Sequence, residues 1–94
     1  IASGIHIVGA PDLAIEIMSP GSENVRRDQI VKRQTYARFG VKEYWVVEPI
    51  AEIIEITRLQ ENVLASVGIF RNEDEISSPL LPNLSFTVKD VFRG

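Results

Sequence analysis

The chain of 94 residues has a hydrophobic share of 45%, a charged share of 24% and a formal net charge of −3, which is the composition of an ordinary soluble globular protein. A chain of this length allows one domain with a modest core, so we expect residues 1–94 to form a single domain. The chain has no cysteine, which excludes disulfides and cysteine-based zinc or redox sites.

The only histidine, His6, argues against a Ser-His-Asp triad and excludes a histidine-rich metal site. A metal site would therefore use oxygen ligands, which suit Mg, Mn or Ca. No apolar run approaches the roughly 18 residues of a membrane span, and the first residues do not resemble a signal peptide. We expect a cytoplasmic protein without membrane contact.

The first elements in the chain are two predicted strands. Residues 5–8 form a short apolar patch that indicates either a lead-in to the next strand or a weak edge strand. The next run, residues 11–20, reads PDLAIEIMSP, and its isoleucines and closing proline favour a buried strand over a helix.

That second strand carries two carboxylates on one face. In a strand, Asp12 and Glu16 share a face with Ala14 and Met18, because side chains alternate with a period of two. A charge next to a core usually needs a cation as its partner. Alternatively, Asp12 is a turn residue at the mouth of the strand and Glu16 pairs with a lysine or arginine on the surface.

A helix is predicted at about residues 23–39, with Ser22 as the N-cap and Gly40 as a left-handed C-cap. On a helical wheel one stripe is expected to be buried, and it consists of Val25, Lys32, Tyr36 and Phe39. The arginines Arg26, Arg27 and Arg33 lie mostly on the opposite side of the wheel.

Lys32 stands in the middle of the predicted buried stripe. Because a lysine is seldom buried without a partner, Lys32 should extend to solvent or meet a carboxylate. Asp28, one turn earlier on the helix, can pair with it. Glu16 can do so instead if the helix folds back over the strand.

The rest of the chain predicts strands. Residues 41–49 form a strand, and a strand, a helix and a second strand within this length make a βαβ unit with parallel strands. Three further strands are expected, the first two as an antiparallel extension, at residues 52–59, 63–70 and 84–88. Residues 71–75 form a solvated acidic loop, Pro79 and Pro82 keep the next segment irregular, and Val91 and Phe92 return to the core. We therefore expect a fold of the broad α/β class, more narrowly an α+β fold, because its sheet mixes parallel and antiparallel strands.

Four segments together resemble the putative restriction endonuclease family of the PD-(D/E)XK nuclease superfamily. They are residues 11–20, the set Asp28, Lys32 and Tyr36, residues 40–49, and residues 78–86 with Val91 and Phe92. The resemblance implies a restriction-endonuclease-like core and a metal-dependent DNA endonuclease that hydrolyses phosphodiester bonds with Mg or Mn. It also implies that Glu16 is a metal ligand and that Lys32 is a catalytic lysine moved from the strand to the helix. Met18 stands where the superfamily pattern has its strand lysine.

In such chemistry, carboxylates hold the metal and a lysine orients water or stabilises developing charge. Asp12 is then the candidate for a second ligand, and Arg26, Arg27 and Arg33 are candidates for contacts to the DNA backbone. The resemblance covers only the C-terminal half of the family. We therefore expect a truncated core with an incomplete site and an uncovered sheet edge, which favours a homo-oligomer. The alternative is a noncatalytic remnant, or an oligomerisation or binding module that retains the nuclease core.

Overall fold

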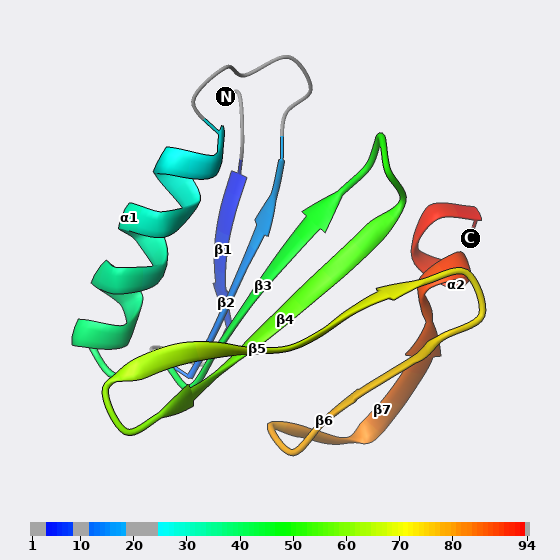
Figure 1. Ribbon diagram of the computed structural model, residues 1–94. Helices are drawn as coiled ribbons and strands as arrows, with labels where there is room; N and C mark the ends of the chain where they lie inside the picture. The colour runs from blue at the N-terminus through cyan, green and yellow to red at the C-terminus, as the bar shows by residue number, and fades with distance from the viewer. Residues whose placement is uncertain (1–3, 9–11, 19–24, 94) are drawn as a thin grey trace.

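A computed structural model of the chain describes residues 4–8, 12–18 and 25–93 and contains two sheets and two helices (Figure 1). The larger sheet has the strand order β1-β2-β3-β4-β5, and the smaller one pairs β6 with β7. The strands are β1 (Gly4–Val8), β2 (Leu13–Ile17), β3 (Glu43–Glu48), β4 (Ile53–Gln60), β5 (Val63–Arg71), β6 (Glu75–Ser78) and β7 (Leu81–Thr87). The helices are α1 (Val25–Arg38) and α2 (Val88–Arg93). No helix in these described ranges is long and apolar enough to cross a membrane.

The larger sheet is mixed, as predicted. Strands β2 and β3 pair in parallel and are joined by α1, whereas β1–β2, β3–β4 and β4–β5 pair antiparallel. A parallel pair needs a crossover connection, and α1 supplies it. The expected βαβ unit with an antiparallel extension is therefore confirmed, with β1 at one edge of the sheet.

The C-terminal end of α1 is closed by a Schellman motif. Gly40 has a φ of 79°, its N–H donates to the carbonyl of Ala37 (3.0 Å), and the N–H of Val41 donates to the carbonyl of Tyr36 (2.9 Å). This confirms Gly40 as the left-handed cap. The predicted start of the helix and Ser22 as its N-cap lie outside the described residues.

The prediction that Phe39 is buried is wrong, because its exposed fraction is 72%. Val41, only 2% exposed, makes the apolar contact beside Tyr36 that closes the helix. The helical periodicity stops at the cap, so the wheel does not apply to Phe39.

The two faces of the sheet bury different clusters. On one face Ala14, Tyr44 and Val46 pack with residues of α1 such as Tyr36. On the other face Leu13 and its neighbours pack against the smaller sheet and α2 (Figure 1). The alternation predicted for β2 is thus confirmed, since Ala14 and Leu13 belong to opposite clusters.

The C-terminal segment is more ordered than predicted. Residues expected to be irregular form most of β6 and the start of β7, which includes Pro82. The rest of β7 agrees with the strand expected at residues 84–88. Proline is tolerated there because β7 has a single neighbour in its sheet, so a missing N–H need not break a ladder. Residues 71–75 are exposed, as expected for an acidic loop, although the strand β6 already begins at Glu75.

The helix α2 was not predicted, although the sequence carries its signal. The Asp90 N–H donates to the Thr87 hydroxyl (3.2 Å), and the Thr87 N–H donates to the Asp90 carboxylate (3.1 Å). This is a capping box, in which side chains satisfy the first N–H groups of a helix. Phe92 packs on the core as expected, whereas Val91 is 45% exposed.

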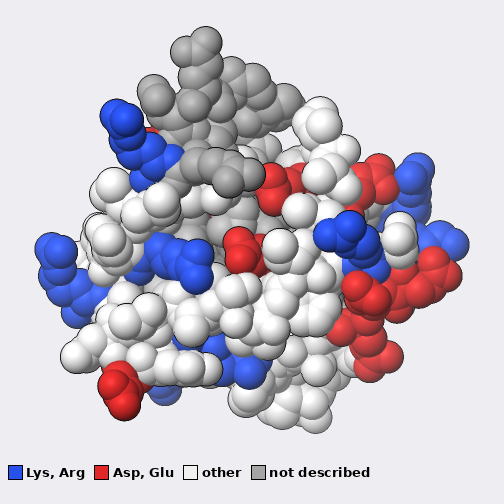
Figure 2. Space-filling view, viewed as in Figure 1, with Lys and Arg blue, Asp and Glu red and all other residues white. Residues whose placement is uncertain are grey.

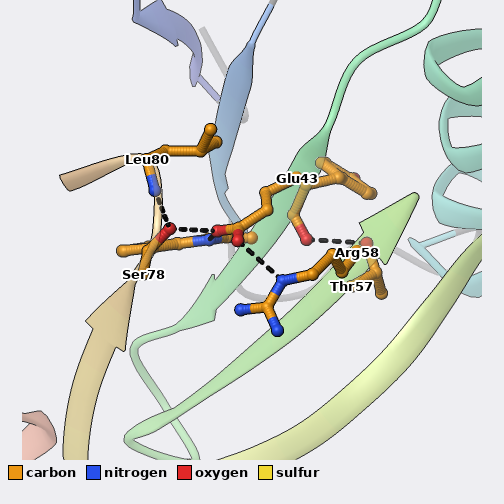
Figure 3. A network of polar contacts seen from close by, with 7 residues as sticks. Glu43, Thr57, Arg58, Ser78 and Leu80 are labelled. Atoms are coloured by element: carbon orange, nitrogen blue, oxygen red, sulfur yellow. Dashed lines mark hydrogen bonds and ion pairs between the residues drawn. The ribbon is translucent and has the colours of Figure 1, made fainter. Parts of the chain in front are cut away.

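A buried carboxylate joins the two sheets (Figure 3). Glu43 at the start of β3 is 1% exposed and accepts hydrogen bonds from Trp45 Nε1 (2.9 Å) and Ser78 Oγ (2.8 Å) at one oxygen. Arg58 Nε on β4 donates to the other oxygen (2.8 Å). Because Ser78 belongs to β6, this network fixes the smaller sheet to the larger one.

Replacing Glu43 with alanine should destabilise the fold by about 3–5 kcal/mol, because buried donors and the Arg58 charge lose their acceptor. Glu43→Gln should lose less, since an amide oxygen still accepts from Trp45 and Ser78. Glu55→Ala, which removes an exposed bond to Ser66, should cost about 1 kcal/mol or less. Urea unfolding measures all three, and an equal loss for Glu43→Ala and Glu55→Ala would contradict the proposed role of the network.

Candidate active site

The candidate site is centred on Glu16, a carboxylate on β2 that is only 3% exposed. Lys32 of α1 forms an ion pair with its Oε2, and Tyr44 of β3 donates a hydrogen bond to its Oε1 (2.5 Å). Asp28, the alternative partner of Lys32, is exposed. The structure therefore places the helix lysine against the strand carboxylate.

The strand register explains how Tyr44 reaches Glu16. Ala14 lies beside Tyr44 in the parallel pair, and Glu16 lies beside Val46. All four residues face α1, and two residues of a strand span about 6.6 Å, which is close to the length of a tyrosine side chain. Ala14 is small, so the phenol ring of Tyr44 can lie along β2 with its hydroxyl at Glu16.

Two tyrosines surround the carboxylate. Burial raises the pKa of Tyr44 far above its usual value, and so do its hydrogen bond to Glu16 and the charge of that carboxylate. The ring of Tyr36 lies 5.1 Å from that of Tyr44, measured between centroids. Burial and the Glu16 charge also raise the pKa of Tyr36, against an opposing effect of Lys32. Both hydroxyls are therefore protonated at neutral pH.

Two further contacts fix α1 over the sheet. Gln29 Nε2 donates to the Met18 sulfur just after β2 (2.7 Å), and Arg33 Nε donates to the Leu64 carbonyl on β5 (2.8 Å). The prediction that Arg33 lies on the outer side of the helix is therefore wrong. The reason is that β5 curves toward the C-terminal half of α1 and covers this side (Figure 1).

The other predicted DNA-backbone arginines differ in what the structure shows. Arg27 is exposed on α1, as the wheel indicated. The side chain of Arg26 lies outside the described residues.

Asp12 lies apart from the Glu16–Lys32 pair. It is in the turn before β2, where its carboxylate pairs with Lys42 (3.5 Å) and is about half exposed, at 47%. Its carbonyl accepts hydrogen bonds from the N–H groups of Lys42 and Glu43, both 3.0 Å long. Four residues of strand place its backbone about 13 Å from that of Glu16. The structure thus brings together Glu16 and Lys32, while Asp12 is in the turn position named as its alternative.

Tyr44 is the site residue that sequence reasoning missed. A parallel β2–β3 pair was predicted, and alternation along β3 places every second residue on the side of α1. The register that sets Tyr44 next to Ala14 depends on the length and course of the crossover, which the sequence pattern does not specify.

Stability at high pH should depend on Tyr44. The folded state binds its phenolic proton more tightly than the unfolded chain, where a tyrosine has a pKa of about 10. This stabilisation is complete below about pH 10 and is lost as the pH rises above that value. We expect the unfolding free energy of the wild type to fall about 1.4 kcal/mol per pH unit more steeply than that of Tyr44→Phe above pH 10. Urea unfolding on both proteins measures the slopes, and equal slopes would show that Tyr44 has no raised pKa.

Comparison with known proteins gives the chain its family. The Uma2 family, described as "Putative restriction endonuclease", matches residues 4–89. The crystal structure of a putative nuclease belonging to DUF820 from Anabaena variabilis ATCC 29413 has a similar fold, with a TM-score of 0.69 and 21% sequence identity. The similarity covers 93% of this chain and 46% of that one, so the chain spans about half the length of the solved nuclease. No curated protein gives a significant sequence match. Because the family match extends over most of its length, the chain belongs to the Uma2 family.

Proposed function

We propose that the chain is part of a metal-dependent endonuclease that hydrolyses phosphodiester bonds in DNA, with Glu16 and Lys32 in its active site. The observation that carries the proposal is the ion pair between Lys32 of α1 and the buried carboxylate of Glu16. A buried ion pair contributes little net stability, because desolvation offsets the attraction between its charges. Such a pair is better explained by chemistry than by folding, and membership of a family described as "Putative restriction endonuclease" agrees with this.

Restriction-endonuclease-like families generally use divalent cations. Glu16 supplies the oxygen ligands that Mg or Mn prefers, and Mg is commonly held by only one or two carboxylates together with water and substrate phosphate. In the part of the chain that the structure describes, no three His, Cys, Asp or Glu residues are grouped to hold a metal. Glu16 is therefore proposed as one protein ligand of such a cation, and Asp12 is the candidate for the other carboxylate. A bound cation would activate water and neutralise charge on the scissile phosphate.

Lys32 supplies a positive charge beside that carboxylate. Its side chain is 27% exposed, whereas that of Glu16 is 4% exposed, so solvent reaches the pair from the lysine side. In the proposed reaction the ammonium group orients the attacking water or stabilises charge that develops on the phosphate.

Asp12 enters the proposal as a second metal carboxylate, supported by its half-exposed side chain at the start of the same strand. Its ion pair with Lys42 supports a turn role instead. Asp12→Asn separates the two roles, because loss of cleavage supports a ligand and unchanged cleavage supports the turn.

Arg26, Arg27 and Arg33 are proposed to meet the DNA backbone. In the view of Figure 2, basic side chains predominate over α1, on the left, whereas on the opposite side acidic side chains gather among basic ones. A basic surface beside the Glu16–Lys32 pair suits a phosphate backbone. Arg33 would contribute its remaining guanidinium donors, since its Nε is bound to Leu64.

A plasmid-nicking assay with Mg or Mn tests the proposal. Glu16→Gln and Lys32→Ala should each lower the cleavage rate by at least about a hundredfold, which is typical when a group that stabilises transition-state charge is removed. Glu55→Gln serves as the matched control, because this acid contacts Ser66 rather than Lys32 and should nick like the wild type. If Glu16→Gln and Lys32→Ala nick as fast as the wild type, the site assignment is wrong. If the wild type does not nick at all, the noncatalytic alternative is favoured.

Moving the lysine from α1 to the strand position sharpens this test. Met18 follows β2 two residues after Glu16, on the same face, at the position of the superfamily's strand lysine. The double variant Lys32→Met with Met18→Lys should recover part of the cleavage that Lys32→Met loses. If the double variant folds but recovers no cleavage, the idea that the ammonium group can act from either α1 or position 18 is wrong.

We also propose a homo-oligomer. Several large apolar side chains on β2 and at or near α1 are 42–72% exposed, namely Ile17, Ile30, Val31 and Phe39. Exposed apolar surface of this kind favours association. Light scattering at micromolar concentration should give at least twice the 10.5 kDa of one chain, and a monomeric mass would contradict the proposal.

A further inference from the structure

The two oxygens of Glu16 are held by different donors. The Tyr44 hydroxyl binds Oε1, and the Lys32 ammonium binds Oε2. The terminal torsion of a glutamate is broad when it is free, so a carboxylate with one donor can still rotate. A second donor on the other oxygen fixes its plane. From this geometry we infer that Tyr44 is a positioning residue, which sets the orientation of the Glu16 carboxylate and thereby the place of Lys32.

Tyr44 is itself rigidly held. It is fully buried, its ring packs against Tyr36, and its carbonyl accepts a hydrogen bond from Thr57 Oγ1 on β4 (2.8 Å). Its chain neighbours Glu43 and Trp45 are hydrogen-bonded to each other on the other face of the sheet. A donor anchored on both faces of a sheet can hold a functional group in one geometry.

A phenol suits this task because it is a neutral donor. A tyrosine hydroxyl, with its usual pKa of about 10, is protonated at neutral pH, so Tyr44 donates to Glu16 without cancelling the carboxylate charge. A cation in its place would neutralise Glu16 and compete with Lys32. Orientation thus comes from Tyr44, and charge pairing comes from Lys32. The catalytic part of this inference rests on the proposed function.

Tyr44→Phe tests the inference by removing only the hydroxyl. In the nicking assay, kcat should fall about 10- to 100-fold while KM for DNA changes less than about twofold, as expected when a residue supports an active group without touching substrate. Ser66→Ala is the control, since it removes a hydroxyl-to-carboxylate bond from the same sheet, at Glu55. Placing 4-aminophenylalanine at position 44 restores a donor and should recover most of the lost kcat, which a purely structural role of the ring would not predict.

A second measurement does not depend on cleavage. NMR relaxation should show a lower side-chain order parameter for Glu16 and a more mobile Lys32 ammonium in Tyr44→Phe than in the wild type, with Ser66→Ala unchanged. If the wild type fails to nick DNA, the noncatalytic alternative is favoured, and the NMR comparison alone decides the role of Tyr44. If Glu16 and Lys32 keep their wild-type order in a folded Tyr44→Phe, the inference is overturned, whatever the activity. Should Tyr44→Phe not fold, the 4-aminophenylalanine protein carries the test, and mobile Glu16 in that protein would overturn the inference.

Discussion

The buried carboxylate of Glu16 imposes a constraint that three elements of the fold must satisfy together. A negative charge with almost no solvent access needs donors, and β2 itself cannot bring side chains to it. The parallel pairing with β3 brings Tyr44, and the crossover that this pairing requires brings Lys32 on α1. The topology of the βαβ unit and the chemistry of the site are therefore two aspects of one arrangement.

Local patterns in the sequence predicted the parts of this arrangement that have a simple period. Alternation along β2 placed Glu16 on one face of the strand, and the helical wheel placed Lys32 in the buried stripe, so their meeting was one of two pairings open to Lys32, the other being Asp28. Gly40 was readable as a cap because helices commonly end at a glycine in the left-handed conformation. The parallel pair followed from one helix between two short strands, and the antiparallel extension followed from the short connections after it.

What could not be predicted depends on long-range geometry. Arg33 contacts β5 because that strand curves beside α1, and no pattern in the helix contains this information. Tyr44 required a register between strands that are distant in sequence. The exposed Phe39 shows where a periodic rule stops applying, at the cap. For α2 the signal was present in Thr87 and Asp90, but the segment is short and follows a proline-containing strand, which obscures a single helical turn.

Successive residues at the start of β3 serve opposite faces, with Glu43 directed to Ser78 and Tyr44 to Glu16. A slip of β3 by one residue against its neighbours would exchange these faces. Glu43 would then turn toward another carboxylate, and Tyr44 would enter the cluster beneath β6. Glu43 would leave Ser78, and Glu16 would lose the Tyr44 hydroxyl, in the same event. Glu43 and Tyr44 together therefore favour the native register of β3, because a shift by one residue raises the free energy of the sheet at two places.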